Sequence, residues 1–266
     1  MLYPSLGNMP ITEIKAPDLL AVLRRIESRG THETAHRVRA LFGRVARYAI
    51  ATGRAERDIS ADLRGALVPV ATRNFPAITE PRRIGELLRA IDGYVGHAPT
   101  EYALKLAPLL FVRPGELRGA KWKEFDLDGA EWRIPAERMK MGREHVVPLS
   151  KQAVALLREL HGIAGRGEYL FPSLRAPSRP ISDNTLNAAL RRLGFAQDEM
   201  TAHGVRSMAS TRLNEMGFAG DVIELQLAHA ARDEIRGAYN RATRMAERKA
   251  MMQSWSDYLD ELRQPA

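Results

Sequence analysis

The spacing of apolar residues is the feature that most constrains the fold of this chain. Between residues 18 and 64, apolar side chains recur every three or four positions, which is the repeat of one face of an α-helix. This periodicity predicts a mainly α-helical protein. The same spacing returns in residues 82–91, 102–111, 151–160, 183–193, 203–216, 221–229 and 233–262.

A proline-containing stretch interrupts the helical pattern and indicates two domains. Residues 67–81 place Pro69, Pro76 and Pro81 among polar residues without any period, as a linker does. A chain of 266 residues is also long enough for two modest cores. We therefore expect a helical domain at residues 1–72, a linker at 73–81 and a larger domain at 82–266.

One segment of the larger domain has a different sequence pattern. Residues 131–134 and 145–149 are short β-prone runs on either side of a Met-Lys-Met-Gly-Arg turn. They predict a β-hairpin with Lys140 and Gly142 in its connection. The expected fold is thus mainly α, with a small antiparallel β-hairpin sheet in the second domain.

The charge balance favours a polyanionic partner. Lysine and arginine number 40 against 32 acidic residues, which gives a net charge of +8 and puts nucleic acid first among partners, although other basic proteins share this feature. The chain has no cysteine, which excludes disulfides, thiolate metal sites and a thiol nucleophile and fits a reducing cytoplasm. No stretch approaches the ~18 apolar residues of a membrane span, so we expect a cytoplasmic protein without membrane contact.

The segment HETAH, which begins at His32, matches the HExxH pattern of zinc sites, and Glu56 offers a third ligand. The same residues also read as an ordinary helix start with Thr31 as the N-cap. Positive charge nearby would repel a dication, so we favour the helix start and expect no metal. Arginines follow the segment at positions Arg37, Arg39, Arg44 and Arg47.

Cationic side chains stand in places where a surface role explains them poorly. Arg113 follows an apolar helix and precedes a Pro-Gly-Glu turn, so it either pairs with Glu116 or faces an anionic ligand. His203 and Arg206 are spaced i, i+3 and share a helix face on which they could hold one phosphate, although HxxR alone is a weak motif.

Two further residues have ordinary explanations when taken alone. His229 ends an apolar helix, where a core histidine with satisfied hydrogen bonds would be usual. Tyr239, ten residues later, reads as a packed aromatic. The order of the whole set changes these interpretations, because it closely resembles the active site of the tyrosine recombinase, or phage integrase, family. The matching residues are Arg113, Lys140, His203, Arg206, His229 and Tyr239.

The sequence around these residues is similar to that of the prophage and genomic-island branch of the family over nearly all 266 residues. Many members begin with a separate arm-site DNA-binding domain, which we expect this chain to lack. Arg113 also follows Leu-Phe-Val instead of the Thr-Gly-x of many members. The matching stretches include RPGELRGAKW, IPAERMKMGREHVVPLS, MTAHGVRSMASTRLNEMG, QLAH, AYNRA and, in the first domain, TAHRVRALFGRVARYAIATGRAERDISADLRGAL.

The resemblance implies a two-domain clamp on double-stranded DNA at attachment core sites. Tyr239 would attack a phosphodiester, leaving a 3′-phosphotyrosine and a free 5′-hydroxyl, without any cofactor. Arg113 and Arg206 would hold the phosphate, and Lys140 would be the general acid to the 5′-oxygen. By the same resemblance, His203 assists proton transfer at Tyr239 and His229 donates a hydrogen bond to the phosphate.

The resemblance also implies self-association to a tetramer on DNA, with possible DNA-bending accessory proteins.

In the first domain, helical geometry places the apolar Val38, Leu41, Phe42, Val45 and Ala49 on one side. Arginines fall on another side of the same helix. They form either a solvated face or a stripe that contacts DNA phosphates, and we favour the stripe because the protein is basic and carries the catalytic set named above. These are Arg37, Arg44 and Arg47. The rival hypothesis is a truncated, catalytically idle DNA-binding remnant or regulator of a full-length integrase.

Overall fold

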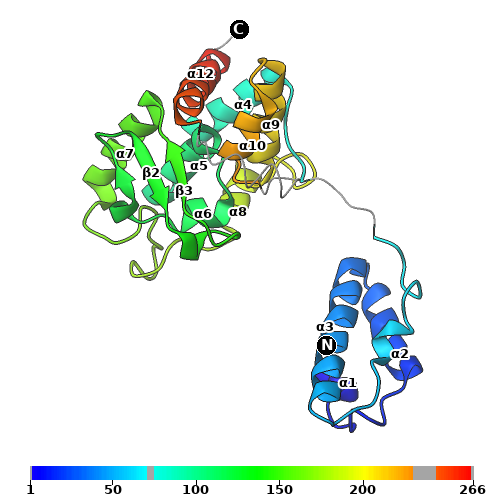
Figure 1. Cartoon of the computed structure of the whole chain (residues 1–266). Coiled ribbons are helices and arrows are strands. Elements are labelled where there is room, and N and C mark those ends of the chain that lie inside the picture. The colour runs from blue at the N-terminus through cyan, green and yellow to red at the C-terminus, as the bar shows by residue number, and fades with distance from the viewer. Residues whose placement is uncertain (1, 71–74, 230–243, 265–266) are drawn as a thin grey trace. The chain divides into compact units, whose positions relative to one another are not determined.

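The computed structural model describes residues 2–70, 75–229 and 244–264. It divides into two compact units, Met1–Asn74 and Phe75–Ala266, which Figure 1 shows with their elements labelled. The mainly helical fold and the small antiparallel sheet that the sequence predicts are both present. The structure thus confirms the expected fold class.

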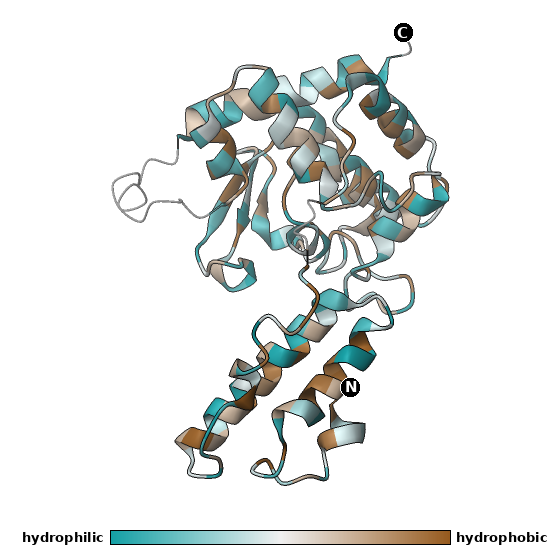
Figure 2. Ribbon diagram, turned by 90° about the vertical axis from the view of Figure 1, so that its right-hand side faces the viewer, coloured by the Kyte–Doolittle hydropathy of each residue, from teal (hydrophilic) through white to brown (hydrophobic). Residues whose placement is uncertain are grey.

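The first unit is built on two helices that pack against each other. Their contact buries Leu19 and Leu23 of one helix against Phe42 and Ala46 of the other. Figure 2 shows hydrophilic and hydrophobic residues alternating along these helices, as expected of helices with one buried face. The elements are α1 (Tyr3–Leu6), α2 (Ala16–Glu27), α3 (His32–Ala51) and the 3₁₀ turn η1 (Ile59–Ala61).

The buried face of α3 differs from the expected one. Phe42 and Ala49 point inward as predicted, but Leu41 and Val45 are 49% and 51% exposed. At 100° per residue, the inner stripe runs through Ala35, Phe42, Ala46 and Ala49, so positions 41 and 45 fall on the adjoining face. The apolar side expected for α3 is therefore buried only in part, because Leu41 and Val45 stay exposed.

The second unit consists of helices around α5, whose residues include the fully buried Leu106 and Leu109. The predicted helix over 233–262 does not run through Arg244, because this residue has a left-handed φ of 41° and caps α12. Residues 230–243 lie outside the described part. The helices are α4 (Pro81–Asp92), α5 (Ala98–Leu110), α6 (Pro114–Arg118), α7 (Lys151–Ala164), α8 (Thr185–Arg192), α9 (Gly204–Glu215), α10 (Gly220–Gln226) and α12 (Met245–Arg263), with the 3₁₀ turns η2 (Trp122–Glu124) and η3 (Ala136–Arg138).

A three-stranded antiparallel sheet with the order β1-β2-β3 interrupts these helices. Strands β2 (Glu131–Ile134) and β3 (His145–Pro148) form the expected hairpin, in register Trp132 with Val147. A two-residue strand, β1 (Phe125–Asp126), was not predicted and pairs with β2. Lys140 lies exposed in the β2–β3 connection, where Gly142 takes a φ of 61° that favours glycine.

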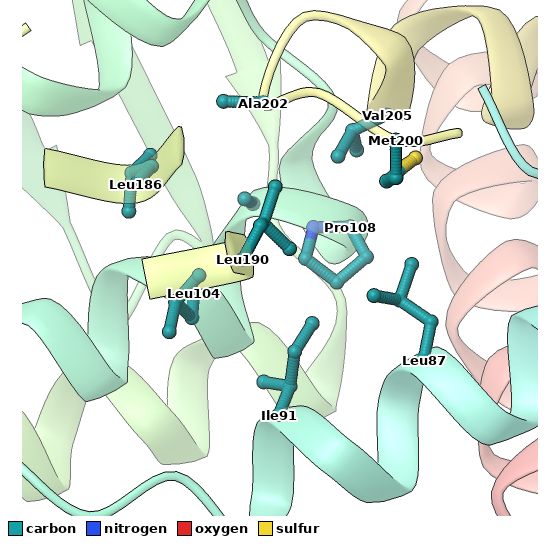
Figure 3. A pocket seen from close by; sticks show the side chains of 10 residues that line it. Leu87, Ile91, Leu104, Pro108, Leu186, Leu190, Met200, Ala202 and Val205 are labelled. Carbon is teal, nitrogen blue, oxygen red and sulfur yellow. The ribbon is translucent and has the colours of Figure 1, made fainter. Parts of the chain in front are cut away.

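Helix α12 packs against α4 and α5 through Trp255. Its indole is fully buried and donates a hydrogen bond to the Pro108 carbonyl at 2.8 Å. Beside Pro108, side chains of α4, α5, α8 and the start of α9 surround an apolar void of about 10 Å³ (Figure 3). A void of that size holds at most one water, so it is a packing gap and not a ligand site.

In the ranges that the structure describes, no helix combines the length and the apolar character needed to cross a membrane.

We expect Trp255→Ala to lower the free energy of unfolding of the second unit by about 3–5 kcal/mol, because it leaves a cavity and an unpartnered carbonyl. Guanidinium denaturation followed by the fluorescence of Trp122 and Trp132 measures this. Val95→Ala, at a side chain that is 94% exposed, is the control and should shift stability by no more than about 0.5 kcal/mol. Equal effects of the two changes would contradict this account of the core.

Candidate active site

Two residues with left-handed backbone shape the centre of the second unit. Phe111 ends α5 with a φ of 34°, and Ala228 follows α10 with a φ of 50°. Such a conformation costs a non-glycine residue roughly 1–2 kcal/mol and is concentrated at functional sites. Both turns present backbone carbonyls to arginines. The candidate site lies at this point.

Arg206 donates hydrogen bonds to two of these carbonyls. Its Nη1 donates to Phe111 O at 3.0 Å, and its Nη2 donates to Leu227 O at 2.7 Å. The residue is only 4% exposed. Burial, and then the positive charge of Arg113, lower the Arg206 pKa to about 10. A buried guanidinium held in this way cannot turn to solvent, and an arriving anion would offset its unfavourable desolvation.

Arg113 lies next to it as the N-cap of α6, a short helix where the sequence indicated only a turn. Glu116 closes a capping box, accepting from Arg113 N at 2.9 Å and from Nη1 at 2.8 Å. Nη2 donates to Ala228 O at 3.0 Å. The pairing with Glu116 that the sequence left open is thus present, and the Arg113 side chain remains 21% exposed.

His203 stands one residue before α9, so that Arg206 falls in the first turn of that helix. Its ring packs on Phe75 with centroids 4.0 Å apart. Burial lowers the His203 pKa, and the charges of Arg206 and Arg113 lower it further. The imidazole is therefore neutral near pH 7, which is the form that can accept a proton.

His229 is placed by the turn at Ala228 and does not lie in the core. Its side chain is 44% exposed, so the usual explanation of such a residue as a core histidine does not apply. Nδ1 lies 2.7 Å from Glu224 Oε2, and Nε2 lies 3.1 Å from Arg206 Nη2. Because a carboxylate only accepts, Nδ1 carries the proton, and Nε2 accepts from Arg206.

The structure therefore brings together Arg113, His203, Arg206 and His229. Lys140 lies in the β2–β3 connection, and in the described ranges no hydrogen bond or ion pair joins it to those residues. Tyr239 lies outside the described residues.

The arginines of α3 divide into two kinds. Arg37 and Arg44 are exposed and lie two turns apart on one face, where Leu41 and Val45 are their neighbours. Arg47 is also exposed, but its guanidinium pairs at 2.9 Å with Asp58, a carboxylate that is only 16% exposed. Arg37 also pairs with Glu33 at 2.9 Å, an exposed contact that is easily exchanged.

The HETAH segment is the start of α3. Thr31 is the N-cap, although its hydroxyl donates to Ile26 O at 2.8 Å instead of capping the helix. His36 Nε2 lies 2.9 Å from the Val68 carbonyl, to which it can only donate. Among the residues that the structure describes, no group of three or more His, Cys, Asp or Glu side chains is placed to hold a metal ion.

Three polar residues beside the cluster were not anticipated from the sequence: His145, Gln226 and Arg248. His145 Nε2 donates to Gln226 O at 3.1 Å. Burial, and then Arg248, lower the His145 pKa to about 4, and Arg113 and Arg206 contribute to the shift. Their sequence signal is weak, because each lies in a run that is already explained as a strand or a helix.

Comparison with known proteins agrees with this fold. Residues 79–245 match the profile described as Phage integrase family, and residues 1–66 match the Phage integrase central domain. The chain belongs to the phage integrase, or tyrosine recombinase, family.

Among individual relatives, the integrase of Enterobacteria phage P4 is 39% identical over 274 aligned residues, which cover 97% of this chain and 62% of that protein. Prophage integrase IntA of Escherichia coli K12 is 38% identical, with 96% of this chain and 62% of IntA covered. The chain thus spans about 62% of the length of these relatives.

Solved structures share the fold. A lambda integrase dimer bound to a COC′ core site matches with a TM-score of 0.67 at 23% identity, covering 91% of this chain and 85% of that one. The Tn1549 transposon integrase in complex with circular intermediate DNA matches with a TM-score of 0.62 at 16% identity, covering 89% and 88%.

The environment of His145 predicts a pH effect on stability. Its pKa is lower in the folded state than in the unfolded one, so its contribution is complete above about pH 6.5 and is lost as the pH falls toward 4. We expect His145→Gln to reduce the loss of unfolding free energy between pH 7 and 4.5 by on the order of 1–2 kcal/mol, since part of the half-buried ring stays hydrated.

Tryptophan fluorescence during denaturation measures this effect in the second unit, because Trp122, Trp132 and Trp255 all lie there. His36→Gln, in the first unit, is the control. An unchanged pH profile for His145→Gln would show that burial does not disfavour protonation of this ring.

Proposed function

We propose that this chain is a site-specific DNA recombinase that cuts and rejoins strands through a 3′-phosphotyrosine at Tyr239. The observation that carries the proposal is the Arg113–Arg206 pair, fixed by carbonyls and flanked by His203 and His229. The relatives that point the same way are integrases, and one lambda integrase structure is a tetramer bound to a Holliday junction.

The two guanidiniums would bind the non-bridging oxygens of the scissile phosphate. Negative charge grows on these oxygens as the phenol oxygen of Tyr239 forms its bond to phosphorus. Planar guanidinium groups can each offer two parallel N–H donors to such an anion. Because carbonyls and Glu116 already hold Arg206 and Arg113, the two guanidinium groups keep their positions when the substrate arrives, and only the contact of Arg206 with His229 has to change.

Proton transfers balance the reaction at its two ends. His203, which is neutral because of its lowered pKa, would take the phenolic proton as Tyr239 attacks. Lys140 would give a proton to the 5′-oxygen as the bond from phosphorus to that oxygen breaks. The products are a 3′-phosphotyrosyl ester and a free 5′-hydroxyl.

His229 needs a rearrangement to donate to the phosphate. In the structure its Nε2 carries no proton and accepts from Arg206, so donation requires both a proton on Nε2 and release of this contact. A bound phosphate favours both changes, because it attracts the Arg206 N–H and stabilises an imidazolium. Glu224 at Nδ1 would orient the ring and support its positive charge.

The ester stores the energy of the broken bond, so rejoining is the same reaction run backward onto a 5′-hydroxyl. A phenol, with a pKa of about 10, is a better leaving group than an alkoxide. No nucleotide or metal cofactor takes part in this scheme. The partner is double-stranded DNA at attachment core sites, and a tetramer assembles on it, with possible DNA-bending accessory proteins, in the cytoplasm.

The exposed face of α3 with Arg37 and Arg44 would contact DNA phosphates. Arg47 would contribute after leaving Asp58, at some electrostatic cost. A DNA-binding protein without catalysis, such as a remnant or a regulator of a longer integrase, would use the same face. Covalent trapping on a nicked suicide substrate separates these two functions.

We expect Tyr239→Phe to abolish covalent attachment to a nicked core-site substrate and to change DNA affinity by less than about threefold, because only the nucleophilic oxygen is lost. Denaturing gels measure the first effect and titration of labelled DNA the second. Tyr258→Phe and Tyr169→Phe are the controls. Recovery of a phosphotyrosine peptide that contains either of these residues would overturn the assignment.

We expect Arg44→Ala to reduce the slope of log affinity against log salt concentration by roughly 0.9, the value for one lost phosphate contact, with little change in sequence preference. Titrations of core-site and random DNA at several salt concentrations test this. Arg57→Ala is a matched control, because Arg57 is an exposed arginine of the same unit that pairs with Asp62. If the two variants have the same slope, Arg44 does not contact DNA.

A further inference from the structure

Arg248 is a buried cation without a carboxylate partner in the ranges that the structure describes. It is 4% exposed, and burial lowers its pKa to about 10. Its Nε and Nη2 donate to Gln226 Oε1 at 3.0 and 2.7 Å, and Nη2 also donates to Val146 O at 2.5 Å. Replacing buried charge with apolar groups is often neutral or stabilising, so stability alone does not explain this residue.

The bonds of Arg248 connect three elements. Arg248 belongs to α12, Gln226 is the last residue of α10, and Val146 lies in β3. His145, the first residue of β3, donates to the carbonyl of the same Gln226. The start of β3 is therefore bonded both directly and through Arg248 to the end of α10. That end of α10 leads within three residues to His229.

The other end of the β2–β3 connection is also anchored. Arg138 donates to the Glu116 carbonyl and to the Glu124 carboxylate, and its side chain is 19% exposed. Glu116 is the residue that binds Arg113. The connection that carries Lys140 is thus fixed at its first end beside Arg113 and at its second end beside His229. Between these anchors, Lys140 itself is exposed.

We propose that Arg248 is a positioning residue for strand cleavage, which locks the start of β3 onto the end of α10 and so determines where the β2–β3 connection delivers Lys140. It touches neither DNA nor the reacting atoms. The inference rests on the proposed strand cleavage with Lys140 as general acid. Gln226 and His145 are its partners in this lock.

The leaving group offers a test that a purely structural role would not pass. An alkoxide needs a proton from Lys140, whereas a thiolate, with a pKa of about 8.5 for a cysteine-like thiol, leaves without one. A nicked core-site substrate with sulfur in place of the bridging 5′-oxygen therefore removes the need for the general acid. A misplaced Lys140 should slow cleavage of the oxygen substrate alone.

We expect Arg248→Gln to slow single-turnover covalent attachment to the oxygen substrate by about 100-fold, the size of effect that a 1 Å misplacement produces. On the sulfur substrate the rate should stay within about threefold of the unchanged chain, and DNA affinity should not change. Lys140→Ala should show the same rescue by sulfur. Arg263→Gln, at an ion-paired arginine on the same helix, is the control and should cleave both substrates normally.

Equal slowing of Arg248→Gln on both substrates, or normal cleavage of the oxygen substrate, would overturn the inference. If Arg248→Gln does not fold, Arg248→Lys, which keeps the charge but not the forked geometry, takes its place. Hydrogen exchange of peptides covering residues 139–148 adds a readout without catalysis: exchange should rise at least about threefold over Arg263→Gln, and unchanged exchange would refute the lock. An unchanged chain that attaches to neither substrate would instead refute the proposed function.

Discussion

The second unit is organised around backbone carbonyls that hold two arginines of like charge. Phe111, Leu227 and Ala228 supply these carbonyls, and two of the three adopt a left-handed backbone to do so. Helices α5 and α10 lead directly into these two turns, and the hydrogen bonds to the arginines offset the conformational strain. Moving either turn would leave a donor of the buried Arg206 without its carbonyl, at a cost of roughly 1–3 kcal/mol that is comparable to or larger than the strain.

Folding alone places the two arginines, before any anion binds. The main-chain oxygens and Glu116 satisfy part of the donor set of Arg113 and Arg206, and Glu116 balances one of the two positive charges. Burial is the first cause of the lowered pKa values of Arg206, His203 and His145, and neighbouring positive charges lower all three further. In the proposed reaction, a phosphate diester would bring negative charge to this region. Its recognition would then depend on an electrostatic environment formed when the chain folds.

The sequence predicted the parts of this structure that depend on local patterns. Helical periodicity gave the helices, the turn between β-prone runs gave the hairpin with Lys140, and the HxxR spacing placed His203 and Arg206 at one helix start. What it missed depends on packing between distant segments. The orientation of Leu41 and Val45 follows from how α2 meets α3, the exposure of His229 follows from the turn at Ala228, and Arg248 acquires its partners only when α12 reaches α10 and β3. No local pattern contains that information.

The two hydrophobic cores have no residue in common. One is built around Leu19, Leu23 and Phe42, and the other around α5 and Trp255. Substitutions on the exposed face of α3 therefore leave the packing that holds the arginine pair untouched. Under the proposed function, such a separation would allow natural selection to alter the way in which the first unit contacts DNA while the catalytic residues of the second stay constant. A recombinase built in this way could acquire new genomic target sites through changes to one small helical bundle.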